Sequence, residues 1–283
     1  MPRTIATTIT ILLASYSLAI AASQPTRSVI YKTPAQGKAL KLHIFEPEKL
    51  IEDRPCIVFF FGGGWTGGSA RQFYQQAKEM AKLGILAISA DYRTKSSHGT
   101  TPQDAVRDAK SAVQWLRKNA KELKIDPNKI IASGGSAGGH IAACTGVIDG
   151  FSNGEVSSKP NAMVLYNPVL DTTRKGYGAG KLGANKTEIS PCHHIKKGIP
   201  PTLVCHGTKD TTVPFENAER FTRLMKKAGN SCTLMAAEGE KHGFFNGKEF
   251  RPKGTNKNFN LTMAATKKFL KEHKLLPKEQ LTE

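Results

Sequence analysis

The stretch Ile130-Ile131-Ala132-Ser133-Gly134-Gly135-Ser136-Ala137-Gly138-Gly139-His140-Ile141 decides the fold of this chain. A β-branched apolar run leads into Gly-x-Ser-x-Gly centred on Ser136, and an apolar helical pattern follows over 141–147. This order predicts a strand, a sharp turn with a serine at its tip, and a helix. So tight a turn strains the backbone at Ser136, and the residues two positions on either side must lack a side chain. A loop merely rich in glycine and serine would share the pattern, so the serine needs partners elsewhere.

The segments around this stretch alternate between strand and helix patterns. Continuous apolar runs predict buried strands, and amphipathic spacing predicts helices. The alternation indicates one α/β domain with a mostly parallel central sheet and helices on both faces. The predicted elements are antiparallel edge strands at 28–31 and 39–45, buried strands at 56–61, 85–90, 130–135, 162–165, 202–205 and 232–236, helices at 73–83, 102–123, 141–147, 214–228 and 260–275, a loop at 96–101 and a turn at 126–128.

Two residues downstream complete a catalytic constellation with Ser136. A serine hydroxyl stays unreactive until a base takes its proton, and the base needs an orienting group. Asp210 follows a predicted strand in His206-Gly207-Thr208-Lys209-Asp210, and His242 follows the last one in Lys241-His242-Gly243-Phe244. Each lies just past the carboxyl end of its strand, the edge where ligands bind in an open α/β sheet. Ser136, His242 and Asp210 are therefore the predicted nucleophile, base and acid.

Composition narrows the classes of partner. The 283 residues carry a formal net charge of +18, but the lysines are dispersed and no nucleic-acid motif is present. This pattern favours a solvated basic surface and no nucleic-acid partner. The cysteine count is five, so at least one thiol is free or intermolecular. Cys56, Cys144 and Cys205 fall in apolar patterns and are predicted to be small buried side chains. The sequence allows one disulfide without naming the pair, and it does not determine the oligomeric state.

The N-terminus has the features of an export signal. Arg3 supplies a positive charge and residues 5–20 are apolar. Both Ala19-Ile20-Ala21 and Ala21-Ala22-Ser23 fit a cleavage site, so the first mature residue stays open within about two positions. A membrane anchor is the alternative, but this run is short and diluted with threonine and serine. The sequence therefore predicts a signal peptide over 1–22 and a catalytic domain over 23–283. The mature protein is expected to be secreted or periplasmic, without membrane attachment after cleavage.

With these residues in place, the chain resembles the α/β-hydrolase fold. More narrowly, it is similar to the esterase and lipase group with an H-G-G-G-W loop, which includes acetylxylan- and feruloyl-esterase-like carbohydrate esterases. The resemblance implies a serine esterase that requires no cofactor. It covers nearly everything after the signal. It rests on Gly62-Gly63-Gly64-Trp65, Asp91-Tyr92-Arg93, the run from Gly134 to Gly139, His206-Gly207-Thr208-x-Asp210-x-x-Val213-Pro214 and His242-Gly243-Phe244.

The resemblance also assigns an oxyanion hole to this chain. Its donors are the backbone N–H groups of Gly63, Gly64 and Ala137, and loss of one such donor typically costs about 2.7–4 kcal/mol. Phe61 departs from the family, which usually has a histidine there that braces the loop. Trp65 is the predicted substrate-binding residue, stacking on a sugar or aryl group. The alternative is that Trp65 only forms a wall of the glycine loop.

Two expectations concern access to the site. Few residues separate the signal from the first strands, so we expect no large N-terminal cap of the kind found in hormone-sensitive-lipase relatives. The site is then open enough for bulky, polymer-linked esters. Residues 171–197 are rich in glycine and lysine with weak periodicity, and they are a candidate for a small lid.

Other titratable residues have different interpretations. Asp171 also follows a strand and is an alternative acid, but its surroundings match nothing in the family, so Asp210 is favoured. His193 and His194 lack a third ligand nearby, so we predict no metal site. The remaining residues are expected to be caps, packed groups or hydrogen-bond partners beneath the site: Asp104, Asp108, His140 and His206.

The expected activity is hydrolysis of a short acyl ester, acetyl or feruloyl, on a polysaccharide. Export, the missing cap and the family resemblance motivate this substrate. Three alternatives stay open. They are a general carboxylesterase or lipase acting on small esters, a serine peptidase related to prolyl oligopeptidase, and a non-catalytic binding member of the fold.

Overall fold

The computed structural model describes residues 24–281. Its strands are β1 (Arg27–Lys32), β2 (Leu40–Phe45), β3 (Arg54–Phe60), β4 (Leu86–Ala90), β5 (Ile125–Gly135), β6 (Ala162–Tyr166), β7 (Thr202–Gly207) and β8 (Cys232–Ala237). Its helices are α2 (Tyr74–Lys82), α3 (Lys95–His98), α4 (Pro102–Lys118), α5 (Ala137–Val147), α6 (Phe215–Lys227) and α7 (Lys257–Glu272). Short 3-10 turns are η1 (Ala70–Phe73), η2 (Ala179–Lys181), η3 (Pro191–His193) and η4 (Lys278–Gln280).

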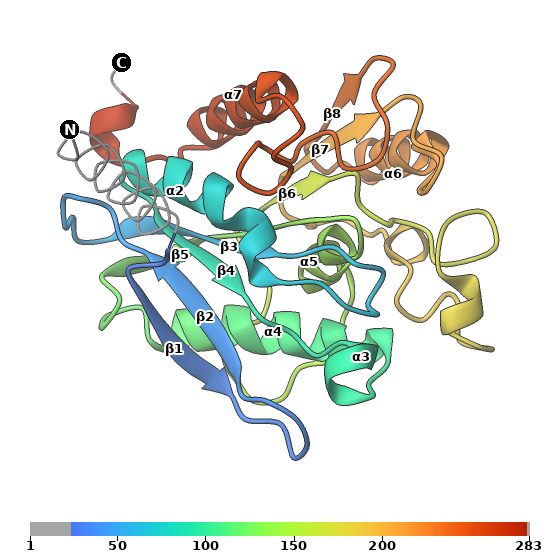
Figure 1. Ribbon diagram of the computed structural model, residues 1–283, viewed down its shortest axis with the longest axis horizontal. Coiled ribbons are helices and arrows are strands. Elements are labelled where there is room, and N and C mark those ends of the chain that lie inside the picture. The colour runs from blue at the N-terminus through green and yellow to red at the C-terminus, as the bar shows by residue number, and fades with distance from the viewer. Residues whose placement is uncertain (1–23, 282–283) are drawn as a thin grey trace, which may run out of the picture.

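The strands form one sheet in the order β1-β2-β4-β3-β5-β6-β7-β8 (Figure 1). Neighbours from β4 to β8 along this order pair in parallel, whereas β1 pairs antiparallel with β2 and β2 antiparallel with β4. The expected α/β-hydrolase architecture, a mostly parallel sheet with an antiparallel edge, is confirmed. Within residues 24–281, no helix precedes the first strand.

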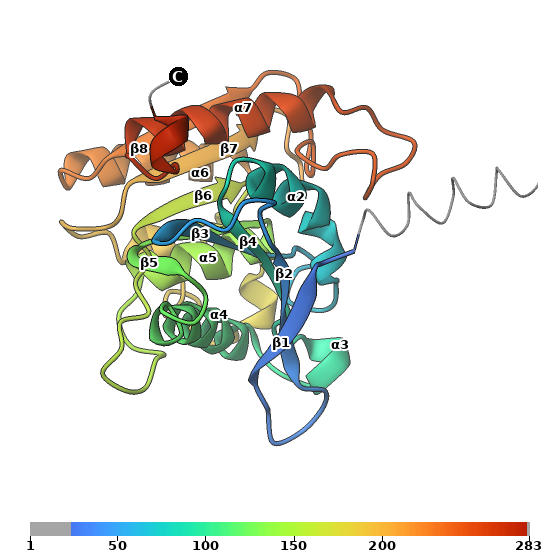
Figure 2. The ribbon, with the colours of Figure 1, turned by 90° about the vertical axis from the view of Figure 1, so that its left-hand side faces the viewer.

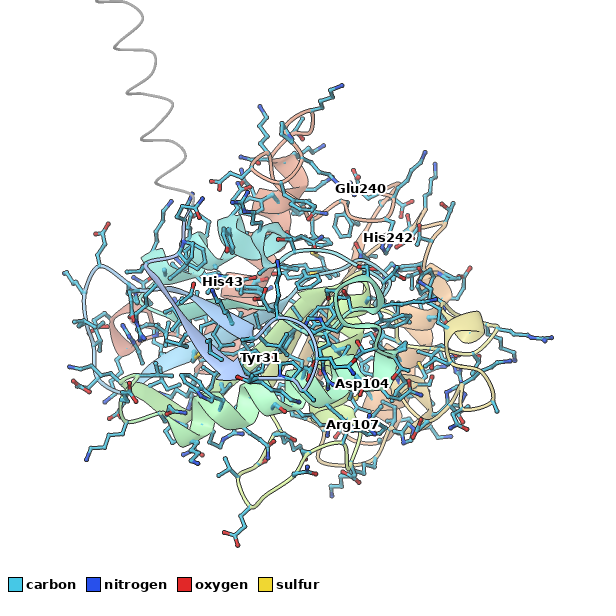
Figure 3. All side chains as sticks on the ribbon, turned by 60° about the horizontal axis from the view of Figure 1, so that its bottom comes forward. Tyr31, His43, Asp104, Arg107, Glu240 and His242 are labelled. Carbon is cyan, nitrogen blue, oxygen red and sulfur yellow. The ribbon has the colours of Figure 1, made fainter. Side chains whose placement is uncertain are left out.

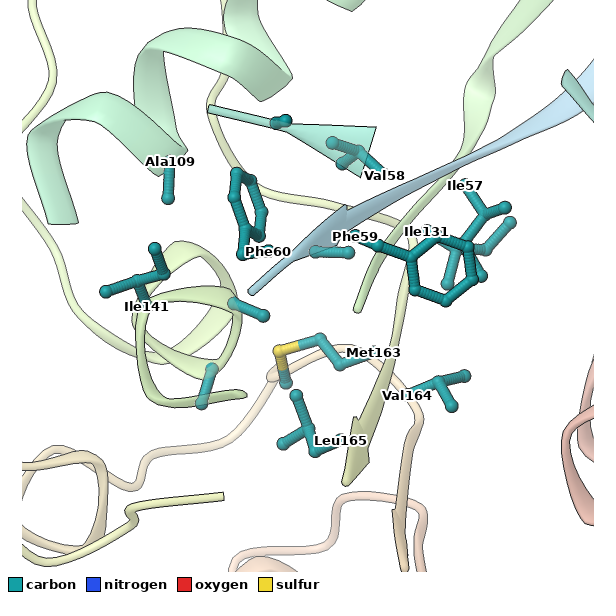
Figure 4. Packing of buried hydrophobic residues seen from close by; sticks show 14 of the residues in the cluster. Ile57, Val58, Phe59, Phe60, Ala109, Ile131, Ile141, Met163, Val164 and Leu165 are labelled. Carbon is teal, nitrogen blue, oxygen red and sulfur yellow. The ribbon is translucent and has the colours of Figure 1, made fainter. Parts of the chain in front are cut away.

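Helices cover both faces of this sheet. The pair α2 and α7 lies on one face, and α4 and α5 lie on the other (Figure 1, Figure 2). Helix α6 packs on β7 and β8 and contacts η3, which also contacts α5. Phe60 of β3 points toward Ala109 of α4 and Ile141 of α5, while Phe59 points to the opposite face (Figure 4). There Phe59 stacks on Phe73 with ring centroids 5.1 Å apart. Each such fully buried ring contributes about 1.5–3 kcal/mol to folding.

Local signals explain where several elements begin and end. Helix α4 starts at a capping box in which the side chains of Thr101 and Asp104 bond each other's backbone N–H. It ends at Lys118 rather than at residue 123. The loop expected over 96–101 overlaps α3, which is followed by its C-cap Gly99 in the left-handed conformation with φ of 65°. The turn expected at 126–128 is absorbed into β5 as an irregularity opposite Arg54.

All five cysteines are free and buried. Cys56, Cys144 and Cys205 are the packed side chains that their apolar surroundings predicted. Burial also raises the pKa of the Cys232 thiol to about 11, so this sulfur stays protonated at neutral pH.

The predicted export signal over 1–22 lies outside the described residues. Within residues 24–281, no helix combines the length and the apolarity that a membrane span requires.

Candidate active site

Ser136 lies at the tip of the turn between β5 and α5, with φ of 55° and ψ of −120°. Few non-glycine residues adopt such angles, and surrounding contacts must hold them. The Ser136 N–H donates to the Tyr166 carbonyl over 3.0 Å, and its own carbonyl accepts from the His140 N–H over 2.9 Å. The next strand and the next helix therefore fix the serine from both sides.

The glycines two positions either side of Ser136 leave no room for a side chain. A Cβ on Gly134 would lie 2.6 Å from the carbonyl oxygens of both Phe60 and Gly138. A Cβ on Gly138 would overlap the Phe60 and Phe61 carbonyl oxygens. The steric argument made from the sequence therefore agrees with the packing of β3 against the turn.

The three predicted side chains come together at this turn. His242 Nε2 lies 3.0 Å from Ser136 Oγ, and His242 Nδ1 lies 2.7 Å from Asp210 Oδ2. Because the carboxylate can only accept, Nδ1 carries the proton and leaves Nε2 free to accept from the serine hydroxyl. Ser136 and His242 are partly exposed, so a substrate can reach them. Figure 3 shows His242 beside Glu240 on the loop that follows β8.

Asp210 is held as a carboxylate by a dense set of donors. Its Oδ1 accepts from the N–H groups of Thr212 and Val213, each over 2.9 Å. Its Oδ2 accepts from His242 and also lies 3.1 Å from His206 Nε2. Burial alone would raise the pKa of Asp210, but the hydrogen bonds from His206, His242 and Val213 outweigh burial and hold that pKa well below its usual range. His206 thus has the expected place beneath the site.

The glycine loop, residues 62–68, runs beside the serine. A Cβ on Gly62 would lie 3.3 Å from Ser136 Cβ. The Gly63 carbonyl is held by the N–H groups of Thr66 and Gly67, and the Gly64 carbonyl by Lys181 Nζ over 2.8 Å.

Within residues 24–281, the N–H groups of Gly63 and Gly64 have no hydrogen-bond acceptor. Ala137 is the first residue of α5, where backbone N–H groups are free for an anion. Gly63 and Gly64 follow Gly62, which lies against Ser136, and keep N–H groups without an acceptor, as the predicted oxyanion hole requires.

Trp65 requires a correction. The indole is only 2% exposed and meets His140 edge-on, with ring centroids 5.0 Å apart. The Tyr177 ring also lies beside the indole, with ring centroids 5.8 Å apart. A ring buried this deeply offers no face to a sugar or an aryl group, so the predicted stacking contact of Trp65 with substrate is wrong in this arrangement.

The rival acidic residues have structural partners. Asp171 is buried and pairs with Arg220 of α6 over 2.6 Å, away from the His242 contact. Asp108 is buried between Arg93 and Lys32, at 2.8 and 2.7 Å. Asp104, besides capping α4, pairs with Arg107, well apart from His242 (Figure 3).

The remaining histidines bind the protein's own backbone or side chains. His140 is buried, and its Nε2 donates to the Ile189 carbonyl over 2.6 Å. Burial lowers the pKa of His140 to about 4, so this ring is neutral at pH 7. His193 bonds Ser190, and His194 bonds the Thr187 carbonyl. In the part of the chain that the structure describes, no group of three or more metal-ligating side chains is assembled.

Three amide side chains that the sequence did not single out brace the site. Asn167 Oδ1 accepts from the Gly243 N–H over 2.9 Å, next to His242. Gln72 Oε1 accepts from the Gly62 N–H over 2.6 Å and Gln72 Nε2 donates to Asn246 Oδ1 over 3.1 Å. Asn167 and Asn246 are buried, yet nothing in their sequence context marks an amide as structural.

Comparisons with known proteins agree with this geometry. The BD-FAE family model matches residues 42–174. The apo form of esterase 2 from Thermogutta terrifontis is 44% identical, with a TM-score of 0.83 over 89% of this chain and 96% of that chain.

Two curated relatives are esterases as well. The probable carboxylic ester hydrolase LipM of Mycobacterium tuberculosis is 30% identical, over 71% of this chain and 52% of the relative. The acetylxylan esterase of Xylanibacter ruminicola is 29% identical, over 69% of this chain and 42% of the relative. The chain spans about half the length of these curated relatives, whereas it covers nearly all of esterase 2. A shared fold, identity of 44% over that length and a serine turn of this geometry show that the chain belongs to the α/β-hydrolase family of serine carboxylic ester hydrolases.

Proposed function

We propose that this protein is an exported serine esterase that removes short acyl groups, acetyl or feruloyl, from polysaccharides. The observation that carries the chemical part is the hydrogen-bonded path from Ser136 through His242 to Asp210. The same arrangement performs acyl transfer on several unrelated folds. The parts of the proposal that concern export and substrate rest on residues 1–22 and on the relatives.

Acylation begins at Ser136. His242 Nε2 takes the hydroxyl proton while Oγ attacks the ester carbonyl carbon, and Asp210 stabilises the imidazolium that forms. The carbonyl oxygen becomes an oxyanion that accepts hydrogen bonds from the N–H groups of Gly63, Gly64 and Ala137. The tetrahedral intermediate then collapses. The ester C–O bond breaks, and His242 gives its proton to the leaving alcohol.

Deacylation repeats these steps with water. His242 takes a proton from a water molecule, whose oxygen attacks the acyl carbon of the acyl-enzyme. The second oxyanion uses the same backbone donors. Collapse returns the proton to Ser136 Oγ and releases the carboxylic acid, which restores the starting state.

A short acyl group has two supports among the relatives. Esterase 2 from Thermogutta terrifontis has been solved with propionate bound and with butyrate bound. The relative from Xylanibacter ruminicola is an acetylxylan esterase. The second candidate function, a general carboxylesterase for small esters, is favoured by the same propionate and butyrate complexes, since these small acids carry no sugar.

A first experiment tests the chemistry. We expect the wild-type protein to hydrolyse p-nitrophenyl acetate and Ser136→Ala to lose about a millionfold in kcat. Ser152→Ala, in an exposed loop, is the matched control and should retain full activity. Equal rates for wild type and Ser136→Ala would contradict the esterase proposal and would favour a non-catalytic binding role.

A second experiment separates the substrates. Acetylated xylan, methyl ferulate and p-nitrophenyl esters of increasing chain length are compared by kcat/KM. Preference for acetylated xylan or methyl ferulate supports the polysaccharide proposal, whereas release from small acyl esters alone favours the general carboxylesterase. Preference for long acyl chains contradicts both. Mass spectrometry of the exported protein tests cleavage near residue 22.

A further inference from the structure

Residues 171–197, which we term the insert, are fastened to the body of the molecule along their length. The buried Asp171 carboxylate pairs with Arg220 of α6. Asn217, also on α6, donates to the Lys175 carbonyl over 3.2 Å. Near the far end, the Ile189 carbonyl accepts from the buried His140 of α5. These contacts hold the insert against α5 and α6 near both of its ends.

One side chain of the insert reaches the glycine loop. Lys181 Nζ donates to the Gly64 carbonyl over 2.8 Å and to Thr66 Oγ1 over 3.2 Å. The ammonium also lies over the rings of Trp65 and Tyr177, 5.9 and 5.4 Å from their centroids. In the described chain no carboxylate forms an ion pair with Lys181, so the loop carbonyl, the hydroxyl and the two rings are its partners.

The insert and the loop fit closely at this point. A Cβ on Gly64 would lie 2.7 Å from Tyr177 Oη and 2.9 Å from Lys181 Nζ. A Cβ on Gly178 would lie 2.5 Å from Cζ3 of Trp65. Gly64 and Trp65 both have positive φ, 60° and 58°, which for a tryptophan requires support from its surroundings. The insert supplies that support.

This contact bears directly on an oxyanion donor. The N–H of Gly64 is one of the proposed donors, and it lies in the same peptide plane as the Gly63 carbonyl. The next peptide plane, which holds the Gly64 carbonyl, restrains this N–H through the φ and ψ angles of Gly64. The preceding carbonyl, of Gly63, is held within the loop by Thr66 and Gly67. The following carbonyl, of Gly64 itself, is held by Lys181 and, over 3.3 Å, by the Thr66 hydroxyl. Without the ammonium, the Gly64 carbonyl keeps only the Thr66 hydroxyl as a hydrogen-bond donor among the described residues.

We propose that Lys181 is a positioning residue for the oxyanion hole, which holds the Gly64 carbonyl so that the Gly64 N–H stays directed at the reacting oxygen. The inference rests on the proposed function, because the hole matters only if Ser136 attacks an ester. A residue that acts on the transition state through such a donor changes kcat more than KM. A purely structural lysine would change stability and leave this split unaffected.

The test compares Lys181→Met, which keeps the apolar stem and removes the charge, with Lys186→Met, which removes a charge from the same insert away from the loop. With p-nitrophenyl acetate, we expect Lys181→Met to lower kcat about 10- to 100-fold while KM changes less than about threefold. Lys186→Met should match wild type. Wild-type activity that depends on Ser136 is measured first, so failure of the proposed function is recognised separately.

A chemical rescue keeps the test decisive if Lys181→Met is unstable. Lys181→Cys is treated with 2-bromoethylamine, so that the thiolate displaces bromide and the new C–S bond attaches an aminoethyl group that restores an ammonium. We expect kcat to recover after this treatment and not after iodoacetamide, which adds a neutral group. The wild-type protein, whose five cysteines are buried, is treated in parallel. Unchanged kcat in Lys181→Met, or equal recovery with both reagents, overturns the proposal.

Discussion

Gln72 Nε2 donates a hydrogen bond to Asn246 Oδ1 over 3.1 Å, across 174 positions of the chain. The same Gln72 accepts from the Gly62 N–H, and the same Asn246 donates to the Gly243 carbonyl over 2.8 Å. One amide pair therefore joins the glycine loop to the residue that follows His242. This path fixes the position of the glycine loop relative to His242. The proposed oxyanion donors and the general base come from segments far apart in the sequence.

Breaking this amide pair should cost activity. We expect Gln72→Leu and Asn246→Ala each to lower kcat/KM about 10-fold, because each frees one loop relative to the other. In the double mutant the losses should not add, with a coupling of about 0.5–3 kcal/mol in a double-mutant cycle. Gln114→Leu, on the remote α4, controls for loss of an amide that bonds only backbone carbonyls. Strictly additive losses would mean that the two amides act independently.

The two candidate acids can be separated by isosteric substitution. Asp210→Asn should lower kcat about 10⁴-fold, because the amide favours the wrong tautomer of His242. Asp171→Asn should lower kcat less than about 10-fold and instead reduce the free energy of unfolding, since Arg220 loses its carboxylate partner. Steady-state kinetics and urea unfolding measure the two effects. If Asp171→Asn lost more kcat than Asp210→Asn, Asp171 rather than Asp210 would be the acid that orients His242.

Asp210 should also make the protein sensitive to acid. Hydrogen bonds keep the pKa of this carboxyl in the folded state below its ordinary value of 3.8. A depressed pKa contributes stability that is fully present above the ordinary value and is lost as the pH falls toward the folded pKa. We therefore expect the free energy of unfolding to fall less steeply in Asp210→Asn than in wild type below about pH 4. If the free energy of unfolding fell equally steeply with pH in both proteins, the pKa of Asp210 would not be lowered in the folded state.

The sequence was enough to predict the fold and to single out three side chains that the structure brings within hydrogen-bond distance. Ser136, Asp210 and His242 each follow a strand, and the topology of a parallel sheet brings such positions to one edge. The burial of Trp65 was not predictable, because its cover comes from His140 and from Tyr177 in an insert without periodicity. The contacts of Gln72 with Asn246 and of Lys181 with the Gly64 carbonyl join residues more than 100 positions apart, and no local pattern encodes them.

The requirement for glycine in the serine turn can be measured as a change in the free energy of unfolding. In Gly138→Ala the new methyl overlaps the carbonyl oxygens of Phe60, the last residue of the fully buried β3, and of Phe61, which follows it. These are backbone atoms, which cannot move aside as a flexible side chain would. We expect a loss of about 3 kcal/mol or more in the free energy of unfolding, at the upper end of overpacking effects. Gly180→Ala is the matched control, because nothing lies within 4 Å of a Cβ there and its φ is not positive. Urea unfolding compares the two variants with wild type. If Gly138→Ala were as stable as Gly180→Ala, the turn would have to relax away from β3, and Ser136 would then lose its hydrogen bond to His242.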